Sequence, residues 1–181
     1  MINKYLKRLY YRLKSNYTTE HLIEKGLKVG SDFHRMHDVI LDPSHCWLIE
    51  IGNNVTMAPR VHILTHDASF KHYFGYARIG NVILGDNIFI GADTVVLPGV
   101  SIGDNVIVGA NSTITKDIKS NVVVAGSPAK VISSLDDFLK KNTIEEFPVY
   151  EENYTIRFGI TTKMKHQMYN DLLSSKFGFV R

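Results

Sequence analysis

Residues 84–119 read LGDNIF-IGADTV-VLPGVS-IGDNVI-VGANST-ITKDIK, which is six units of six residues without a gap. The first position of every unit is aliphatic: Leu84, Ile90, Val96, Ile102, Val108 and Ile114. The fifth position holds Ile88, Thr94, Val100, Val106, Ser112 and Ile118. A period of 3.6 would scatter the aliphatic residues around a helix, and a period of two gives no reason for Gly to recur directly after them. Six-residue repetition instead predicts a parallel β-helix.

In such a fold each unit of six supplies one short strand and one corner. Three sides make one coil of about eighteen residues, and stacked coils place like positions in columns. The first and fifth positions then face inward, while Gly85-Asp86-Asn87 and Gly103-Asp104-Asn105 provide residues that tolerate a sharp corner. A β-sandwich would instead need turns about every 8–12 residues. We therefore predict an all-β fold whose β-helix covers residues 21–132.

Composition limits the remaining possibilities. The chain has 181 residues, 44% of them hydrophobic, which suits one domain with a tail. It contains no apolar run of membrane-spanning length and no recognisable signal peptide. A single cysteine, Cys46, cannot form an internal disulfide and so favours the cytoplasm. The net charge of +3 is too small to indicate a nucleic-acid partner.

Two segments flank the predicted β-helix. Residues 3–15 have the pattern of a basic amphipathic helix. We expect residues 1–20 to cap the open end of the β-helix, although contact with an anionic membrane surface is the alternative. Residues 133–181 form a C-terminal extension, with a short helix predicted over 136–141 and another around 166–175. No pattern in this extension points to chemistry.

The six-residue rhythm is interrupted before residue 84. The step from Ile63 to Leu84 is 21 residues, which is not a multiple of six, and it predicts an inserted loop over residues 66–81 that is rich in polar and aromatic side chains. Loops that leave a rigid scaffold often carry function. His45 lies eighteen residues before Ile63, where an aliphatic residue is expected. We interpret this as a local slip of register, with His45 at the edge of a site.

His66 opens the loop and is followed by Asp67. A neutral imidazole can remove a proton from a hydroxyl or an amine. Residue type alone equally allows a histidine that only forms hydrogen bonds within the loop.

Ala92 and Ala110 are eighteen residues apart and therefore occupy the same position on adjacent coils. Two small residues in a column would leave a track of accessible backbone for an extended ligand that carries amides, or they merely permit a tight corner. Lys116 and Lys130 lie downstream, where they could meet phosphates or simply face solvent.

The sequence resembles the left-handed β-helix, hexapeptide-repeat acyltransferases, and within them the small sugar O-acetyltransferases. That group includes the galactoside and maltose acetyltransferases and many modifiers of capsule or lipopolysaccharide. The resemblance covers about residues 48–133 and rests on four motifs: IGNNVTMAP from residue 51, ILTHDAS from residue 63, IGDNVIVGANSTITKDI from residue 102 and VVAGSPAKVI from residue 123. It implies a homotrimer with each active site in the groove between two subunits.

The resemblance also assigns roles to residues. His66 matches the catalytic base of the family. Ala92 and Ala110 match residues whose backbone lines the pantetheine arm of acetyl-CoA. The positions beside the nucleotide and its phosphates correspond to Thr115, Lys116 and Lys130. The sugar-binding asparagine and aspartate of the family lie before the IGNN motif. We expect the acceptor to be bound by Asp42, His45 and Asp67.

The function predicted from the sequence is transfer of an acetyl group from acetyl-CoA to a hydroxyl of a sugar or polysaccharide precursor. His66 would deprotonate the hydroxyl, which would attack the thioester directly, with no metal and no covalent intermediate. Cys46 is the sole thiol for a covalent route, and no motif activates it.

Three alternatives stay open. The acceptor could be an amine, as on an amino sugar or an antibiotic. A zinc enzyme of the carbonic anhydrase kind, which uses three histidines across a subunit interface, would draw them from among His45, His62, His66 and His72. The solenoid could also be a binding surface without catalysis.

Overall fold

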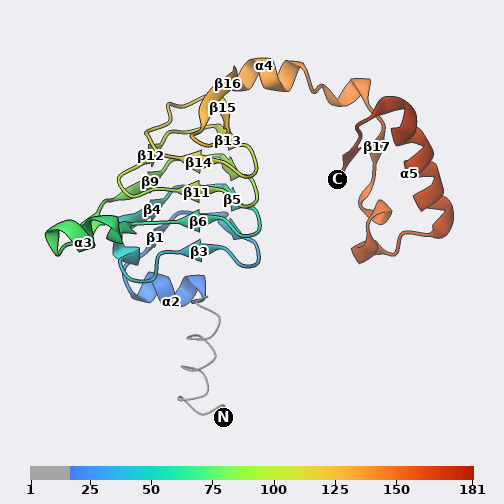
Figure 1. Ribbon diagram of the computed structural model, residues 1–181. Helices are drawn as coiled ribbons and strands as arrows, with labels where there is room; N and C mark the ends of the chain where they lie inside the picture. Colours follow the sequence, from blue (N-terminus) through green and yellow to red (C-terminus); the bar gives the residue numbers. More distant parts are fainter. Residues whose placement is uncertain (1–16) are drawn as a thin grey trace, which may run out of the picture. The chain divides into compact units, whose positions relative to one another are not determined.

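The computed structural model describes residues 17–181, so the helix expected over residues 3–15 lies outside the described residues. The chain divides into two compact units, one ending at Leu135 and the other spanning Asp136–Arg181. In the first unit, short strands stack coil upon coil (Figure 1). None of the helices described in residues 17–181 is long and apolar enough to cross a membrane.

Three sheets of parallel strands form the sides of the coils, which confirms the predicted parallel β-helix. The first sheet contains β1 (Lys28–Val29), β4 (Ile49–Ile51), β9 (Val82–Leu84) and β12 (Ser101–Ile102). The second contains β2 (His34–Arg35), β5 (Val55–Met57), β10 (Ile88–Ile90), β13 (Val106–Val108) and β15 (Val122–Ala125), with β16 (Lys130–Ser134) antiparallel at its edge. The third contains β3 (Ile40–Leu41), β6 (His62–Ile63), β11 (Val95–Val96) and β14 (Thr113–Ile114).

The columns predicted from the repeat are the core. Ile88 pairs with Val106 and Ile90 with Val108, both eighteen residues apart. All six first-position residues of the repeat are at most 2% exposed. Thr94 is a polar exception in the interior, and its hydroxyl donates to the carbonyl of Gly109 over 3.2 Å. Removal of apolar side chains from water, coil after coil, provides the main stabilisation of the stack.

One corner of the β-helix is held by a ladder of asparagines. Asn54, Asn87, Asn105 and Asn121 all have φ between 53° and 63°. Side-chain amides join consecutive members at 2.9, 3.0 and 3.0 Å. Asparagine tolerates the left-handed conformation better than most residues with a side chain, so it satisfies the bend and the hydrogen bonds together.

Three steps between coils depart from eighteen residues. In the last of them, Val106 pairs with Val122, only sixteen residues later. Ile63 pairs with Val96, 33 residues later, because the insertion lies between them. The insertion contains β7 (His66–Asp67), η2 (Ala68–Phe70), α3 (Lys71–Phe74) and β8 (Arg78–Ile79), and it projects from the stack in Figure 1. Ile63 also pairs with Leu41 rather than with His45, since η1 (Cys46–Leu48) lengthens the preceding coil. The slip of register interpreted at His45 is therefore confirmed.

The segments at either end of the β-helix are mostly helical. On the N-terminal side, α2 (Thr19–Glu24) is capped by the hydroxyl of Thr18, which accepts from the His21 backbone N–H. On the C-terminal side, α4 (Leu135–Lys140) lies where a short helix was predicted over 136–141. The second unit contains the parallel pair β17 (Val149–Tyr150) and β18 (Phe179–Val180) together with α5 (Thr162–Ser175) and three short turns, η3 (Ile144–Glu146), η4 (Glu152–Tyr154) and η5 (Ile156–Phe158). Tyr150 is the buried centre of this unit, and its hydroxyl lies 3.1 Å from a carboxylate oxygen of Asp171.

Candidate active site

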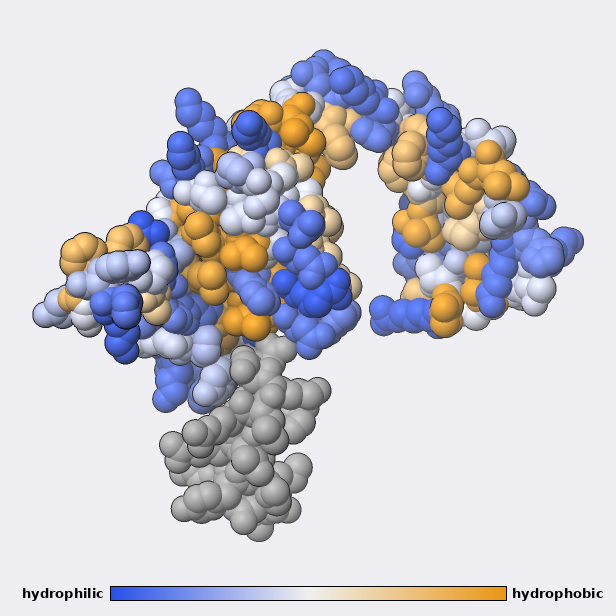
Figure 2. Space-filling view, viewed as in Figure 1, coloured by the Kyte–Doolittle hydropathy of each residue, from blue (hydrophilic) through white to orange (hydrophobic). Residues whose placement is uncertain are grey.

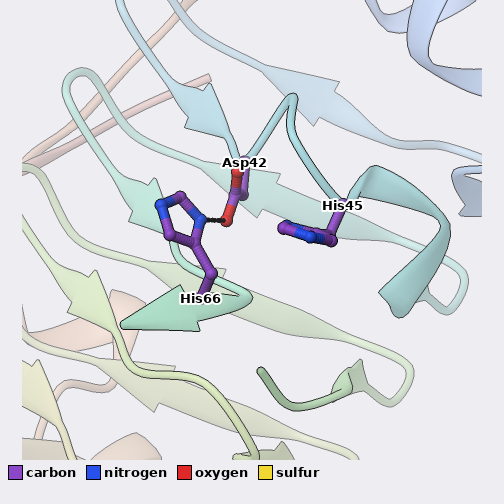
Figure 3. Close-up of side chains that lie close together, drawn as sticks. All are labelled: Asp42, His45 and His66. Carbon is purple, nitrogen blue, oxygen red and sulfur yellow. Dashed lines mark hydrogen bonds and ion pairs between the residues drawn. The ribbon is translucent and has the colours of Figure 1, made fainter. Parts of the chain in front are cut away.

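His66 and Asp42 form a close pair where the third sheet passes into the first. His66 begins β7 just after β6, and Asp42 follows β3 on the preceding coil. The Nδ1 atom of His66 lies 2.5 Å from Oδ2 of Asp42, as Figure 3 shows. The side chain of His66 is 37% exposed, whereas that of Asp42 is 2% exposed. A buried carboxylate therefore supports an imidazole that remains open to solvent.

Asp42 is held by donors from two neighbouring residues. Its Oδ2 accepts from the backbone N–H of Thr65 at 3.0 Å and from the Thr65 hydroxyl at 2.8 Å. Its Oδ1 accepts from the backbone N–H of Ser44 at 3.0 Å. Burial favours a raised pKa for Asp42, but the hydrogen bonds from Thr65, His66 and Ser44 outweigh burial and hold that pKa below its ordinary value. Asp42 is thus an ionised acceptor at neutral pH.

The charge of Asp42 decides which nitrogen of His66 can act as a base. A carboxylate has no proton to donate, so Nδ1 of His66 must be the donor in their hydrogen bond. In a neutral ring the other nitrogen, Nε2, then carries the free lone pair. The pair can therefore accept a proton at Nε2 and stabilise the imidazolium that results, as in other histidine–carboxylate pairs.

This arrangement differs from the expectation that Asp42 binds the acceptor. Asp42 is buried and its oxygens are taken by Thr65, Ser44 and His66, so it holds the His66 ring instead. Asp67, the other expected carboxylate, accepts from Ser69 N at 2.9 Å and from Arg78 at 3.4 Å. The backbone hydrogen bond from Ser69 is the main reason that the pKa of Asp67 is lowered. Asp67 therefore shapes the start of the insertion.

His45 lies beside Asp42 and His66. The sequence predicts His45 at the edge of a site. Its ring centroid is 5.6 Å from that of His66 and 5.4 Å from that of Trp47. Nδ1 of His45 is buried and has no hydrogen-bond partner among residues 17–181. Trp47 is 53% exposed next to it. The rings of His66, His45 and Trp47 therefore follow one another, and the indole of Trp47 is exposed to solvent.

Cys46 is unsuited to a covalent route. It is fully buried, and its Sγ lies 3.7 Å from the carbonyl oxygens of Leu22 and Lys25. Burial raises the pKa of the Cys46 thiol, which disfavours the nucleophilic thiolate.

The small-residue column lies where the spacing predicted. The backbone N–H of Asn111 donates to the carbonyl of Ala92 at 2.7 Å, which joins the two coils at this position. A Cβ placed on Gly91 would lie 2.5 Å from the backbone nitrogen of Ala110, so the coils approach closely here. Ala110 is exposed and Ala92 is half-buried. The stacking of Ala92 and Ala110 is therefore confirmed as a feature of the fold.

The other residues expected to bind acetyl-CoA lie at the C-terminal end of the β-helix. Thr115 and Lys116 directly follow β14, and Lys130 opens β16, where it pairs with Ala125. All three side chains are exposed. They are therefore accessible to an anionic ligand.

Within one chain, His66 does not lie beside the column of Ala92 and Ala110. Ala92 lies at the corner between the second and third sheets, because β10 precedes it and β11 follows it. His66 lies at the corner between the third and first sheets. The width of the third sheet separates the two corners.

The three-histidine zinc site is not assembled within one chain. In the described part of the chain, the group of possible metal ligands is Asp42, His45 and His66. His62 lies on the outward side of β6 and His72 lies in α3, outside that group.

Three residues that contact Asp42 or His45 were not singled out from the sequence: Ser44, Thr65 and Trp47. The Asp42-Pro43-Ser44 stretch carried a usable signal, because Asp followed by Pro and Ser favours a turn in which the carboxylate accepts a nearby N–H. The sequence around Thr65 carries no such signal, because the contact of Thr65 with Asp42 joins two coils.

The fold and this site define a hexapeptide-repeat acyltransferase. Residues 81–116 match the family model described as bacterial transferase hexapeptide (six repeats). Protein CapG of Staphylococcus aureus is 35% identical over 181 residues, which cover 91% of this chain and all of CapG. The chain belongs to the hexapeptide-repeat acyltransferase family, and it is an acetyl-CoA-dependent enzyme of that family.

Two solved structures share the fold. A maltose O-acetyltransferase from Clostridium difficile 630 has a TM-score of 0.56 and 33% identity, with 73% of this chain and 85% of that chain covered. A hexapeptide-repeat acetyltransferase from Vibrio cholerae O1 biovar eltor, solved with acetyl coenzyme A, has a TM-score of 0.55 and 27% identity, with 61% of each chain covered. The β-helix is left-handed, as expected for this family.

Proposed function

We propose that this enzyme transfers an acetyl group from acetyl-CoA to a hydroxyl of a sugar or polysaccharide precursor in the cytoplasm, with His66 as general base. The observation that carries the proposal is the contact between Asp42 and His66. It fixes the ring so that Nε2 is the basic nitrogen, and the exposure of His66 gives an acceptor access to it.

The reaction needs one proton transfer and one acyl transfer. Nε2 of His66 takes the proton of the acceptor hydroxyl as its oxygen attacks the thioester carbonyl. The C–S bond breaks, and the coenzyme A thiolate leaves and takes up the proton. Asp42 stabilises the imidazolium between these events by accepting from Nδ1–H. General-base assistance of this kind contributes about 10²–10⁴-fold to a rate.

The donor would lie along the column formed by Ala92 and Ala110, with its phosphates near Lys116 and Lys130. Because this column and His66 lie at different corners, we propose a homotrimer in which the base of one subunit meets the donor column of the next. Figure 2 shows hydrophobic patches next to hydrophilic ones over the face that carries the third sheet. Ile40 and Val95 face outward there and would suit a subunit contact, while His62 and Thr113 are polar residues that face the same side.

The acceptor site is assigned to the surface around His45 and Trp47. An exposed indole beside His45 suits a sugar ring, whose apolar face can pack on an aromatic side chain. Trp47 also borders a cavity of about 200 Å³ together with Tyr17 and Lys25, which leaves room for a polar group of the acceptor. The similarity to a maltose O-acetyltransferase supports a sugar hydroxyl as the acceptor class.

The test is release of coenzyme A by the purified protein. Maltose, galactosides and free amino sugars would be offered with acetyl-CoA, and the product would be identified by mass spectrometry and NMR. We expect ester formation on a hydroxyl sugar, with kcat lowered at least about a hundredfold in His66→Ala and little change in the KM for acetyl-CoA. Amide products would replace the proposal with N-acetylation. Near wild-type turnover in His66→Ala would remove His66 as the base.

A further inference from the structure

Asp42, His45 and His66 bring three metal-type ligands together around the base. One carboxylate oxygen and one ring nitrogen from each histidine lie within 4.8 Å of one another. In Figure 3 the carboxylate of Asp42 lies between the two rings. We propose that this group binds a divalent cation of the zinc class, and that the bound cation inhibits acetyl transfer. The inhibitory part rests on the proposed function of His66.

The donor set fits a zinc ion in type and spacing. Zinc takes imidazole nitrogen and carboxylate oxygen at about 2.0–2.2 Å in tetrahedral geometry, so its ligand atoms lie roughly 3.3–3.5 Å apart. The most distant donors need to approach by at most about 1.5 Å to reach that spacing, and Nδ1 of His66 and Oδ2 of Asp42, now 2.5 Å apart, would separate by about 1 Å if both bound the ion. Thr65 and Ser44 already orient the carboxylate, as outer partners of metal ligands commonly do.

The state of His45 is a second and independent observation. Its Nδ1 is buried and has no hydrogen-bond partner in the described part of the chain. A buried polar atom without a partner is unfavourable, because it has lost its hydrogen bonds to water. The ring of His45 contributes one nitrogen to the group, and its centroid lies 5.6 Å from that of the His66 ring. A cation coordinated by Nδ1 of His45 would give this atom a partner.

A bound cation would prevent His66 from acting as a base, whichever of the two ring nitrogens coordinates it. Coordination through Nδ1 requires its proton to move, and in a neutral ring the proton then sits on Nε2. Nε2 becomes an N–H donor and cannot accept the proton of a hydroxyl. Coordination through Nε2 uses the same lone pair directly. Neither route gains or loses a proton overall, and both prevent base catalysis.

The experiment uses the untagged full-length protein after treatment with a chelator. Co²⁺ titration is followed by visible absorption and by fluorescence of Trp47, the single tryptophan, whose ring lies 5.4 Å from that of His45. The affinity for Zn²⁺ is measured by competition with a chromophoric chelator. We expect one ion per chain and quenching of Trp47, with binding at least about tenfold weaker in His45→Gln and in His66→Gln. The control His72→Gln changes a histidine outside the group and should bind like the wild type.

Two outcomes would overturn the site: equal affinity in His45→Gln and the wild type, or loss of binding in His72→Gln. Melting temperatures of the metal-free variants verify folding, and His66→Gln carries the test if His45→Gln does not fold. Binding requires no acceptor, so a protein that binds Zn²⁺ but transfers no acetyl group would contradict the proposed function and leave the site in place. Full occupancy by Zn²⁺ without inhibition of an active enzyme would overturn the inhibitory role.

Discussion

Oδ2 of Asp42 lies 2.5 Å from Nδ1 of His66, although 24 residues separate them in the chain. Asp42→Asn keeps the size of the side chain and removes its charge. An amide can donate to Nδ1, which would move the ring proton to Nε2 and remove the base from its working tautomer. We expect kcat to fall about tenfold to a thousandfold, with the KM for acetyl-CoA nearly unchanged.

Steady-state kinetics and a pH–rate profile check this prediction. Asp67→Asn is the matched control, since Asp67 holds the turn at Ser69 and does not touch His66 in a hydrogen bond. A control that loses as much kcat as Asp42→Asn would show that general disturbance of the loop explains both losses.

Asp42 should also make stability depend on pH. Its pKa is lowered in the folded protein, so its contribution is complete above the unfolded pKa of about 3.9 and is lost as pH falls through the lower folded value. The free energy of unfolding of the wild type should therefore exceed that of Asp42→Asn most above about pH 4, and the difference should shrink in more acidic solution. Urea titrations at fixed protein concentration measure it. A difference that stays constant down to pH 2 would contradict this sign.

The repeat determined what could be predicted from the sequence. Inward residues such as Ile90 and Val108 follow from a fixed spacing, and the same count placed Ala92 beside Ala110. The contact between Asp42 and His66 does not follow from spacing, because η1 lengthens one coil and moves the register between them. The conformation of an irregular segment depends on its contacts with neighbouring coils, and a local sequence pattern does not predict those contacts. The interior of the β-helix was therefore predictable, while the partner of the base was not.

Asn87 is the central test of the asparagine ladder, since it bonds to Asn54 at 2.9 Å and to Asn105 at 3.0 Å with φ of 57°. Asn87→Ala loses both hydrogen bonds, and it puts alanine, which tolerates the left-handed conformation less well than asparagine, at a position with positive φ. We expect the free energy of unfolding to fall by roughly 2–4 kcal/mol. Asn87→Gly loses the same bonds without the backbone penalty and should lose about 1–2 kcal/mol less. Equal losses in both variants would show that conformation at this corner contributes little.

Ala110 tests the donor column. Ala110→Phe fills the exposed small-residue position next to the backbone that acetyl-CoA would contact, so the KM for acetyl-CoA should rise at least about tenfold. The melting temperature should stay close to the wild-type value, because Ala110 is exposed. Lys119→Phe introduces the same side chain at another exposed position and should leave the KM unchanged. An unaltered KM in Ala110→Phe would place the donor elsewhere.

Mixed oligomers test whether His66 and Ala110 act across a subunit contact. At an acetyl-CoA concentration well below the wild-type KM, His66→Ala trimers and Ala110→Phe trimers should each show at most about a tenth of wild-type activity. In a trimer with a head-to-tail contact, an intact site forms wherever the His66 of an Ala110→Phe subunit meets the Ala110 of a His66→Ala subunit. Random assembly of equal amounts creates this pairing in about one quarter of the contacts, so about a quarter of wild-type activity should return after co-refolding. Sedimentation measurements verify that the mixture is trimeric. Separately assembled trimers mixed without exchange are the control and should show no such recovery. A site built within one chain predicts no recovery in either sample, because every subunit then carries one defect.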